Sequence, residues 1–225
     1  KQLRAEMARA GATYLAAARA VSQQRAGAAR KLEKVVEAEI NDLAMKAKFR
    51  IEIDGTDSEE NWGATGFDEV RYMIATNAGE PLKPVEEISS GGELSRVMLA
   101  LKATVEGKPT LATAAKVGHP QKTLVFDEID TGIGGRAAEA VGKKLKGLSG
   151  TSQVICVTHL PQIASFADQH YVIEKKEAGG RTKTSVRRLD AAERKEELAR
   201  MMSGAKVSEA SLQHAEAMLK GAWRK

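Results

Sequence analysis

Two short apolar segments, each followed by polar residues, constrain the fold of this chain most. The first is Thr123–Phe126, which runs into the adjacent carboxylates Asp127 and Glu128, and the second is residues 153–158, which leads to His159. A helical pattern fills the interval between them. Strands joined by a helix usually run parallel, so the pattern predicts an α/β fold with a parallel sheet and flanking helices. The polar ends should then meet at one edge of the sheet, where α/β proteins bind ligands.

A glycine-rich loop precedes these strands. Its residues Ser90-Gly91-Gly92-Glu93 lead into a helix, for which Ser90 is a suitable N-cap and Glu93 completes a capping box. The apolar residues that follow predict one buried face: Leu94, Val97, Met98 and Leu101. An open helix start offers N–H groups and the positive end of the dipole to a phosphate. A plain glycine turn before a buried helix is the alternative.

The acid pair has two interpretations as well. Asp127 offers the hard oxygen that Mg²⁺ prefers, and Glu128 is placed to orient or deprotonate a water molecule. Both residues would equally suit the end of a strand and the start of a turn. His159 follows the neighbouring strand, and although a lone histidine is usually structural, this one is expected at the same edge as the carboxylates.

Residues 1–48 contain no proline and predict one long helix with a heptad seam. The seam consists of Leu3, Met7, Ala10, Tyr14, Ala17, Val21, Gln24 and Ala28. A lone amphipathic helix is marginal in water, and no second heptad helix follows, so we expect its partner outside this sequence. The segment holds ten Lys or Arg and five Asp or Glu, whereas the other 177 residues are balanced. The excess indicates a solvated helix face or contact with nucleic-acid phosphates.

Further patterns predict the remaining elements. These are a hairpin of strands at 49–53 and 70–75 with a long connection, a loop at 110–121, an edge strand at 181–188, a helix capped by Asp190 and Glu193 that runs to Met202, and a last helix at 208–223. The four positive charges of the edge strand indicate edge protection or a contact with DNA. His119, His170 and His214 lack the spacing of a metal site and are expected to be structural.

Cysteine content and hydropathy limit the compartment. The single cysteine, Cys156, excludes an internal disulfide and a cysteine-based zinc site, and is expected to be a small buried hydrophobe in a cytoplasmic protein. No run of 18 uncharged apolar residues exists, so no membrane span is predicted. The first residues lack a signal-peptide pattern and include no initiating methionine, which suggests a piece of a longer chain.

The order of these motifs resembles the ABC-type ATPase head. Ser90-Gly91-Gly92-Glu93 resembles the signature motif, residues 124–128 resemble Walker B, Asp130 resembles the D-loop aspartate, and His159 resembles the switch histidine. The exact residues in and around these motifs resemble more specifically bacterial RecN, a family of SMC-like proteins of DNA double-strand-break repair. The segments that carry it are 75–77, 90–96, 126–135, 157–164, 168–175 and 196–202.

The resemblance implies a role for each residue of these motifs. In related heads two protomers enclose two ATP molecules, and the signature of one protomer contacts the γ-phosphate bound by the other. Ser90, Gly91, Gly92 and Glu93 would thus bind nucleotide in the partner. Asp127 would hold Mg²⁺, Glu128 would polarise the hydrolytic water, His159 would contact the γ-phosphate and Asp130 would lie at the dimer interface.

The sequence departs from the resemblance in one respect, because it contains no Gly-x-x-x-x-Gly-Lys-Ser/Thr loop. The resemblance therefore implies a descending coiled-coil helix at 1–48 and a C-terminal head lobe at 49–225, which needs an N-terminal Walker A lobe and would be inactive alone. The implied partners are that lobe, a second copy of the protein and double-stranded DNA ends, in the cytoplasm at the nucleoid. An ABC transporter nucleotide-binding subunit and a non-catalytic DNA tether remain alternatives.

Overall fold

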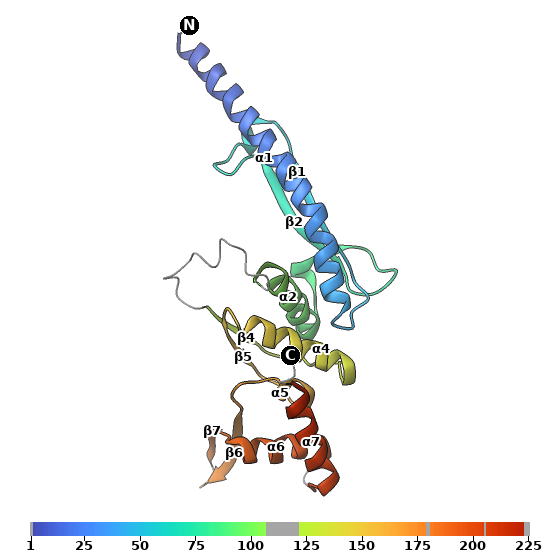
Figure 1. Ribbon diagram of the computed structural model, residues 1–225. Helices are drawn as coiled ribbons and strands as arrows, with labels where there is room; N and C mark the ends of the chain where they lie inside the picture. The colour runs from blue at the N-terminus through green and yellow to red at the C-terminus, as the bar shows by residue number, and fades with distance from the viewer. Residues whose placement is uncertain (1, 107–121, 179–180, 205, 223–225) are drawn as a thin grey trace. The chain divides into compact units, whose positions relative to one another are not determined.

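The computed structural model describes residues 2–106, 122–178, 181–204 and 206–222, and these residues form two compact units (Figure 1). The N-terminal unit comprises residues 2–41 and 45–89, and the C-terminal unit comprises residues 42–44 and those from 90 onward. The first two strands therefore belong with the long helix, whereas the sequence predicted them as part of the head lobe. The predicted loop at 110–121, His119 and Trp223 lie outside the described residues.

The N-terminal unit begins with helix α1 (Gln2–Asn41), which ends earlier than predicted. The side chain of Asn41 accepts a hydrogen bond from the Ala47 amide at 3.1 Å and donates one to the Ala47 carbonyl at 3.5 Å. Between them Ala44 adopts a left-handed backbone with φ of 60°. This local turn reverses the chain, so the prediction of one helix through residue 48 was wrong by seven residues.

The predicted hairpin is confirmed. Strands β1 (Lys48–Gly55) and β2 (Asp68–Ala75) pair antiparallel over their whole length. Their long connection includes the short helix η1 (Glu59–Asn61), and β3 (Lys83–Pro84), followed by η2 (Val85–Glu87), adds a short third strand beside β2.

Helix α1 finds a partner in this hairpin, which corrects the expectation that its partner lies outside the sequence. The carboxylates of Glu33 and Glu37, one helical turn apart, accept hydrogen bonds from the backbone amides of Ile51 at 2.8 Å and Phe49 at 3.0 Å. These amides belong to the free edge of β1, which would otherwise be open to pairing with another chain. Figure 1 shows β1 and β2 alongside the helix.

The beginning of α1 differs from the rest of the helix. Leu3 and Met7, on the predicted seam, are 71% and 67% exposed. Further along, the ring of Tyr14 stacks on Trp62 with centroids 4.5 Å apart. The expectation of a partner beyond this sequence thus stays open only for the first turns of the helix.

The C-terminal unit contains the predicted strand–helix–strand arrangement. Helix α2 (Gly91–Glu106) is followed by β4 (Thr123–Phe126), α4 (Gly135–Leu148) and β5 (Gln153–Cys156), and β4 and β5 pair parallel. The parallel pair with flanking helices confirms the predicted fold class.

The two strands are less buried than predicted. Leu124 and Phe126 lie on the covered face of β4, but Val125 is 65% exposed, and Ile155 and Val157 are exposed on the same face of the neighbouring strand. Both faces are apolar in sequence, yet the described part of the chain covers only one of them.

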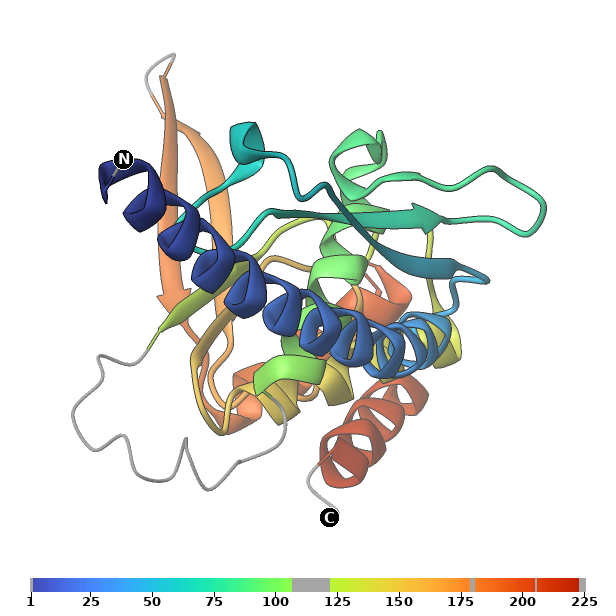
Figure 2. The ribbon, with the colours of Figure 1, turned by 90° about the horizontal axis from the view of Figure 1, so that it is seen from above.

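The rest of the unit consists of α5 (Pro161–Ala164), a two-stranded antiparallel ribbon of β6 (Tyr171–Ala178) and β7 (Arg181–Arg188), and the helices α6 (Ala191–Ser203) and α7 (Glu209–Ala222) (Figure 2). The predicted capping box of Asp190 and Glu193 is formed in both directions, and Gly204 ends α6 with φ of 73°. A small core joins α5, α6 and α7. Its buried members are Ala164, Leu198, Ala199 and Ala215, and the partly buried Met201, Met202, Leu212 and Leu219 pack against them. Within the described residues, no helix is long and apolar enough to cross a membrane.

His170 makes the stability of the C-terminal unit depend on pH. Its Nδ1 is buried without a hydrogen bond among the described residues, and its pKa is lowered by burial and then by the charge of Arg194. Between that lowered pKa and about 6.5 the unfolded segment binds more protons, so stability falls as the pH drops through about 6.5. We expect amides of α6 in the full-length protein to exchange hydrogen faster at pH 5.5 than at pH 7.5 after correction for intrinsic exchange.

The variant His170→Gln should remove this dependence, and His214→Gln, at an exposed position of α7, should retain it. An unchanged pH dependence in His170→Gln would contradict the assignment.

Candidate functional site

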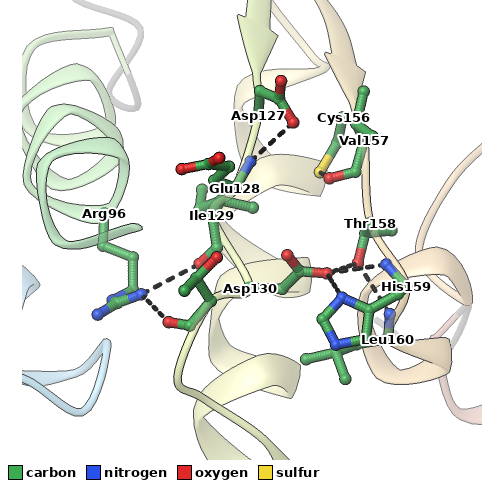
Figure 3. Close-up of polar contacts among 11 residues, drawn as sticks. Arg96, Asp127, Glu128, Ile129, Asp130, Cys156, Val157, Thr158, His159 and Leu160 are labelled. Carbon is green, nitrogen blue, oxygen red and sulfur yellow. Dashed lines mark hydrogen bonds and ion pairs between the residues drawn. The ribbon is translucent and has the colours of Figure 1, made fainter. Parts of the chain in front are cut away.

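The residues that follow β4 and β5 lie next to each other at one edge of the parallel pair. The Val157 amide donates to the Phe126 carbonyl at 3.0 Å, which extends the pairing by one residue beyond the strands. The acid pair after β4 and the histidine after β5 therefore share this edge, as the sequence predicted, and Figure 3 shows them together.

The turn after β4 has an unusual backbone at the second carboxylate. Glu128 has φ of 55°, a left-handed conformation that costs a non-glycine residue roughly 1–3 kcal/mol. Two hydrogen bonds hold it, because the Glu128 amide donates to Asp127 Oδ1 at 2.9 Å and the Glu128 carbonyl accepts from the Thr131 amide at 3.0 Å. The side chains of the acid pair remain exposed.

Asp130 lies on the inner side of this turn and is almost fully buried. Its Oδ2 accepts two hydrogen bonds, from the Thr158 hydroxyl at 2.6 Å and the His159 amide at 2.8 Å, and the His159 Nδ1 lies 2.9 Å from the same oxygen (Figure 3). The Thr158 hydroxyl in turn accepts from the Leu160 amide at 3.0 Å. The first turn is thereby tied to the segment after β5.

A second buried charge holds the other side of the turn. The guanidinium of Arg96, on α2, donates through Nη1 to the carbonyls of Thr131 at 2.9 Å and Ile129 at 3.3 Å (Figure 3). Burial lowers the pKa of Arg96, and the charge of Glu93 raises it in part. The arginine thus supplies donors to two carbonyls that flank Asp130 and fixes α2 against the turn.

The start of α2 adjoins the acid pair. The Ser95 hydroxyl donates to the Asp127 carbonyl at 2.9 Å. A Cβ on Gly91 would meet Glu128 Oε2 at 2.5 Å, and a Cβ on Gly92 would meet Thr131 Cβ at 2.9 Å. Gly92 therefore permits a close approach between the helix start and the turn that a larger residue would block, whereas the exposed Glu128 side chain could move away from a Cβ on Gly91.

The predicted capping box at this helix start is only half formed. The Ser90 hydroxyl accepts from the Glu93 amide at 3.4 Å, whereas within the described residues the Glu93 carboxylate makes no bond back to Ser90. One donor of the helix start is thus weakly satisfied, in contrast to the complete capping box of α6.

The buried face of α2 differs from the predicted one. Of the predicted residues, Val97 is fully buried, Leu94 and Leu101 are half-buried and Met98 is exposed. The other buried residues of the helix are Gly92, Arg96, Leu99 and Ala100. The close approach at Gly92 rotates this other stripe toward the turn. The sequence analysis also missed Arg96, because it predicted a different buried face. Arg96 lies three positions before Leu99 and four after Gly92, which puts it on the same helix face as both residues and could have indicated its burial.

The site offers oxygen ligands but no complete metal cage. Among the described residues no group of three His, Cys, Asp or Glu side chains is arranged to hold an ion. Burial, followed by the charges of Asp130 and Asp127, raises the pKa of the Cys156 thiol to about 12. This half-buried cysteine stays protonated at neutral pH and is no nucleophile.

The structure thus places the residues predicted to bind nucleotide near one another in the C-terminal unit. Ser90, Gly91, Gly92 and Glu93 begin α2, Asp127, Glu128 and Asp130 follow β4, and His159 follows β5. Thr158, Ser95 and Arg96 complete the network, and sequence reasoning assigned them no part in it.

Sequence comparison finds similarity to RecN proteins. DNA repair protein RecN of Vibrio cholerae is 38% identical to the chain over 208 residues, which cover 92% of this chain and 35% of the relative. RecN of Treponema pallidum is 41% identical over 226 residues, which cover 99% of this chain and 38% of the relative. Over nearly its whole length the chain is similar to a part of these RecN proteins. It spans little more than a third of the length of these RecN relatives, and no family model matches it.

A solved structure supports the fold. An Smc head domain with a coiled coil and joint from Pyrococcus yayanosii superposes with a TM-score of 0.51 at 20% identity, covering 80% of this chain and 30% of the other. At this identity the likeness shows a shared fold and carries no residue roles.

The close approach at Gly92 predicts a specific sensitivity. In Gly92→Ala the new methyl group would meet Thr131 and the Glu128 carbonyl, at 2.9 and 3.0 Å, and we expect a loss of about 1–3 kcal/mol in unfolding free energy. Chemical denaturation of the full-length protein measures it. Gly134→Ala is the matched control, because nothing lies within 4 Å of its Cβ position. Equal midpoints for the two variants would refute the tight contact.

Proposed function

We propose that the chain is the C-terminal part of an SMC-like ATPase that acts in DNA double-strand-break repair and recombination. ATP would bring two heads together, hydrolysis would separate them, and the attached helical arm would couple the change to bound DNA ends. The observation that carries the proposal is the convergence of the α2 start, the acid pair after β4 and His159 in one unit. The similarity to RecN proteins supplies the biological setting of the proposal.

The residues present fit a magnesium–nucleotide complex. Mg²⁺ is usually bound by one or two carboxylates together with substrate phosphates, and Asp127 offers an exposed carboxylate with one oxygen already oriented by the Glu128 amide. Mg²⁺ would be held by Asp127 and would supply charge neutralisation on the phosphates. The exposed carboxylate of Glu128 is the group available to orient and deprotonate a water molecule.

The α2 start suits a phosphate. Ser90 and the two glycines leave N–H groups of the first helical turn at the positive end of a 16-residue helix. In the proposed closed state Ser90, Gly91, Gly92 and Glu93 would contact a nucleotide bound by the other protomer, and His159 would contact the γ-phosphate of its own.

The open apolar face of β4 and β5 supports a partner lobe. Val125, Ile155 and Val157 would be covered by a lobe that also provides the Walker A loop, since no such loop occurs in the sequence. The described segment would accordingly be inactive alone. The other proposed partners are a second copy of the protein and double-stranded DNA, and the proposed location is the nucleoid in the cytoplasm.

The assignment of Glu128 as the base is directly testable. In the full-length protein Glu128→Gln should reduce ATP turnover by about 10²–10⁴-fold, because the amide cannot accept a proton from water. Nucleotide binding should persist, so ATP should accumulate on a closed dimer, as measured by size-exclusion chromatography with light scattering.

Glu139→Gln is a matched control, since Glu139 is an exposed carboxylate of α4 that forms an ion pair with Lys143. Turnover in this variant should equal that of the parent. Unchanged ATP turnover in Glu128→Gln would contradict the assignment of Glu128 as the general base.

A further inference from the structure

Two consecutive residues of α2 hold the backbone on either side of Glu128. The Ser95 hydroxyl donates to the carbonyl of Asp127, the residue before it, at 2.9 Å. The guanidinium of Arg96 donates to the carbonyl of Ile129, the residue after it, at 3.3 Å (Figure 3). The helix therefore fixes the chain both before and after the residue proposed as the base.

Arg96 is bound more firmly to the turn than this one contact shows. The same Nη1 donates to the Thr131 carbonyl at 2.9 Å. The residue is only 6% exposed, and among the described residues its Nε has no hydrogen-bond partner. A buried cation needs polar partners to offset the water that it loses, and here backbone carbonyls are the partners that the structure describes. The arginine can leave the turn only by losing them.

The guanidinium and the turn both lie close to the start of α2. A Cβ on Gly92 would lie 3.2 Å from Arg96 Nη1 and 3.0 Å from the carbonyl oxygen of Glu128. A Cβ on Gly91 would meet the Oε2 of Glu128 at 2.5 Å, so the carboxylate reaches the same helix start. The backbone and the side chain of Glu128 are accordingly both next to the first residues of α2.

The backbone of Glu128 depends on such support. Its φ of 55° is a conformation that non-glycine residues seldom adopt, and it persists only where the surrounding structure holds it. Relaxation to an ordinary φ would turn the adjoining peptide units. The Ile129 carbonyl would then move away from Arg96, and the carboxylate of Glu128 would point elsewhere. The direction of the carboxylate is therefore tied to the hydrogen bonds of Arg96.

We propose that Arg96 is a positioning residue for Glu128. Its guanidinium holds the turn so that the carboxylate stays beside the α2 start, where the proposed reaction needs a base. The inference deepens the proposed function and rests on it for the reaction. Because α2 also carries the residues proposed to contact the nucleotide of the other protomer, the arginine links those residues to the base of its own protomer.

Arg194 provides a matched control within the same unit. It is 9% exposed, and its Nη2 donates to the carbonyls of Ala164 at 3.1 Å and Ser165 at 2.9 Å. Its Nε likewise has no partner among the described residues. Of the two arginines, Arg96 is the one that bonds to the turn of the acid pair. A loss of activity that reflects reduced stability alone should therefore appear in variants of both.

Hydrogen exchange tests the contact without nucleotide. In the full-length protein, peptides spanning residues 127–133 should take up deuterium about 2–10-fold faster in Arg96→Lys than in the parent, as measured by mass spectrometry. The reason is that a single ammonium group does not reproduce the planar set of donors of a guanidinium. Arg96→Met, which has no donor, should exchange faster still, and Arg194→Lys should leave these peptides unchanged.

ATP turnover provides the second readout. Arg96→Lys should lower kcat about 10–100-fold, because a small displacement of a catalytic group is enough for such a loss. Binding of a fluorescent ATP analogue should persist, and Arg194→Lys should retain the parental kcat. If Arg96 acts through the base, the double variant Arg96→Lys/Glu128→Gln should be no slower than Glu128→Gln alone.

Three results would overturn the proposal: parental kcat in Arg96→Lys, equal losses of kcat in Arg96→Lys and Arg194→Lys, or losses that multiply in the double variant. Arg96→Lys keeps the positive charge, so the test stands even where Arg96→Met fails to fold. Absence of ATP turnover in the parent would count against the proposed function. Unchanged exchange of residues 127–133 in Arg96→Lys would refute the role of Arg96 in either case, so the two failures are distinguishable.

Discussion

The turn between β4 and α4 is held from two sides by charged groups that are removed from water. Arg96 donates to two of its carbonyls from one side, and Asp130 reaches across to Thr158 and His159 on the other. A buried charge without partners would cost several kcal/mol, so each group stabilises the fold only while its contacts persist. This double support is what allows Glu128 to keep a left-handed backbone.

Because the buried groups hold the turn in place, the side chains that it carries can remain exposed. The side chains proposed to act on a nucleotide, Asp127, Glu128 and His159, are exposed, whereas the groups that position them are buried. Beside them the strands present an apolar face that no part of the described residues covers. A site with exposed acids, an open helix start and an unfilled apolar face has the properties of half of a larger pocket, in agreement with a chain that spans about a third of its RecN relatives.

Much of this arrangement was predictable from the sequence because it depends on short-range patterns. The parallel strands, the shared edge of the acid pair and His159, and the cap of α6 by Asp190 all follow from spacing and residue type. The buried face of α2 could not be predicted in this way, because two apolar stripes overlap on that helix. The close contact at Gly92 determines which of the two stripes faces the turn. The end of α1 depends on one Asn41 side chain, and its partner depends on a hairpin distant in sequence.

The central claim is that the α2 start of one protomer and the acid pair of another enclose the same nucleotide. The most direct test is a cryo-electron microscopy structure of the full-length protein with ATP bound and hydrolysis blocked. The account predicts Ser90 of one protomer within hydrogen-bond distance, about 2.5–3.0 Å, of a γ-phosphate whose metal is held by Asp127 of the other. A nucleotide contacted by Ser90 and Asp127 of a single protomer, or one remote from Ser90 altogether, would contradict it.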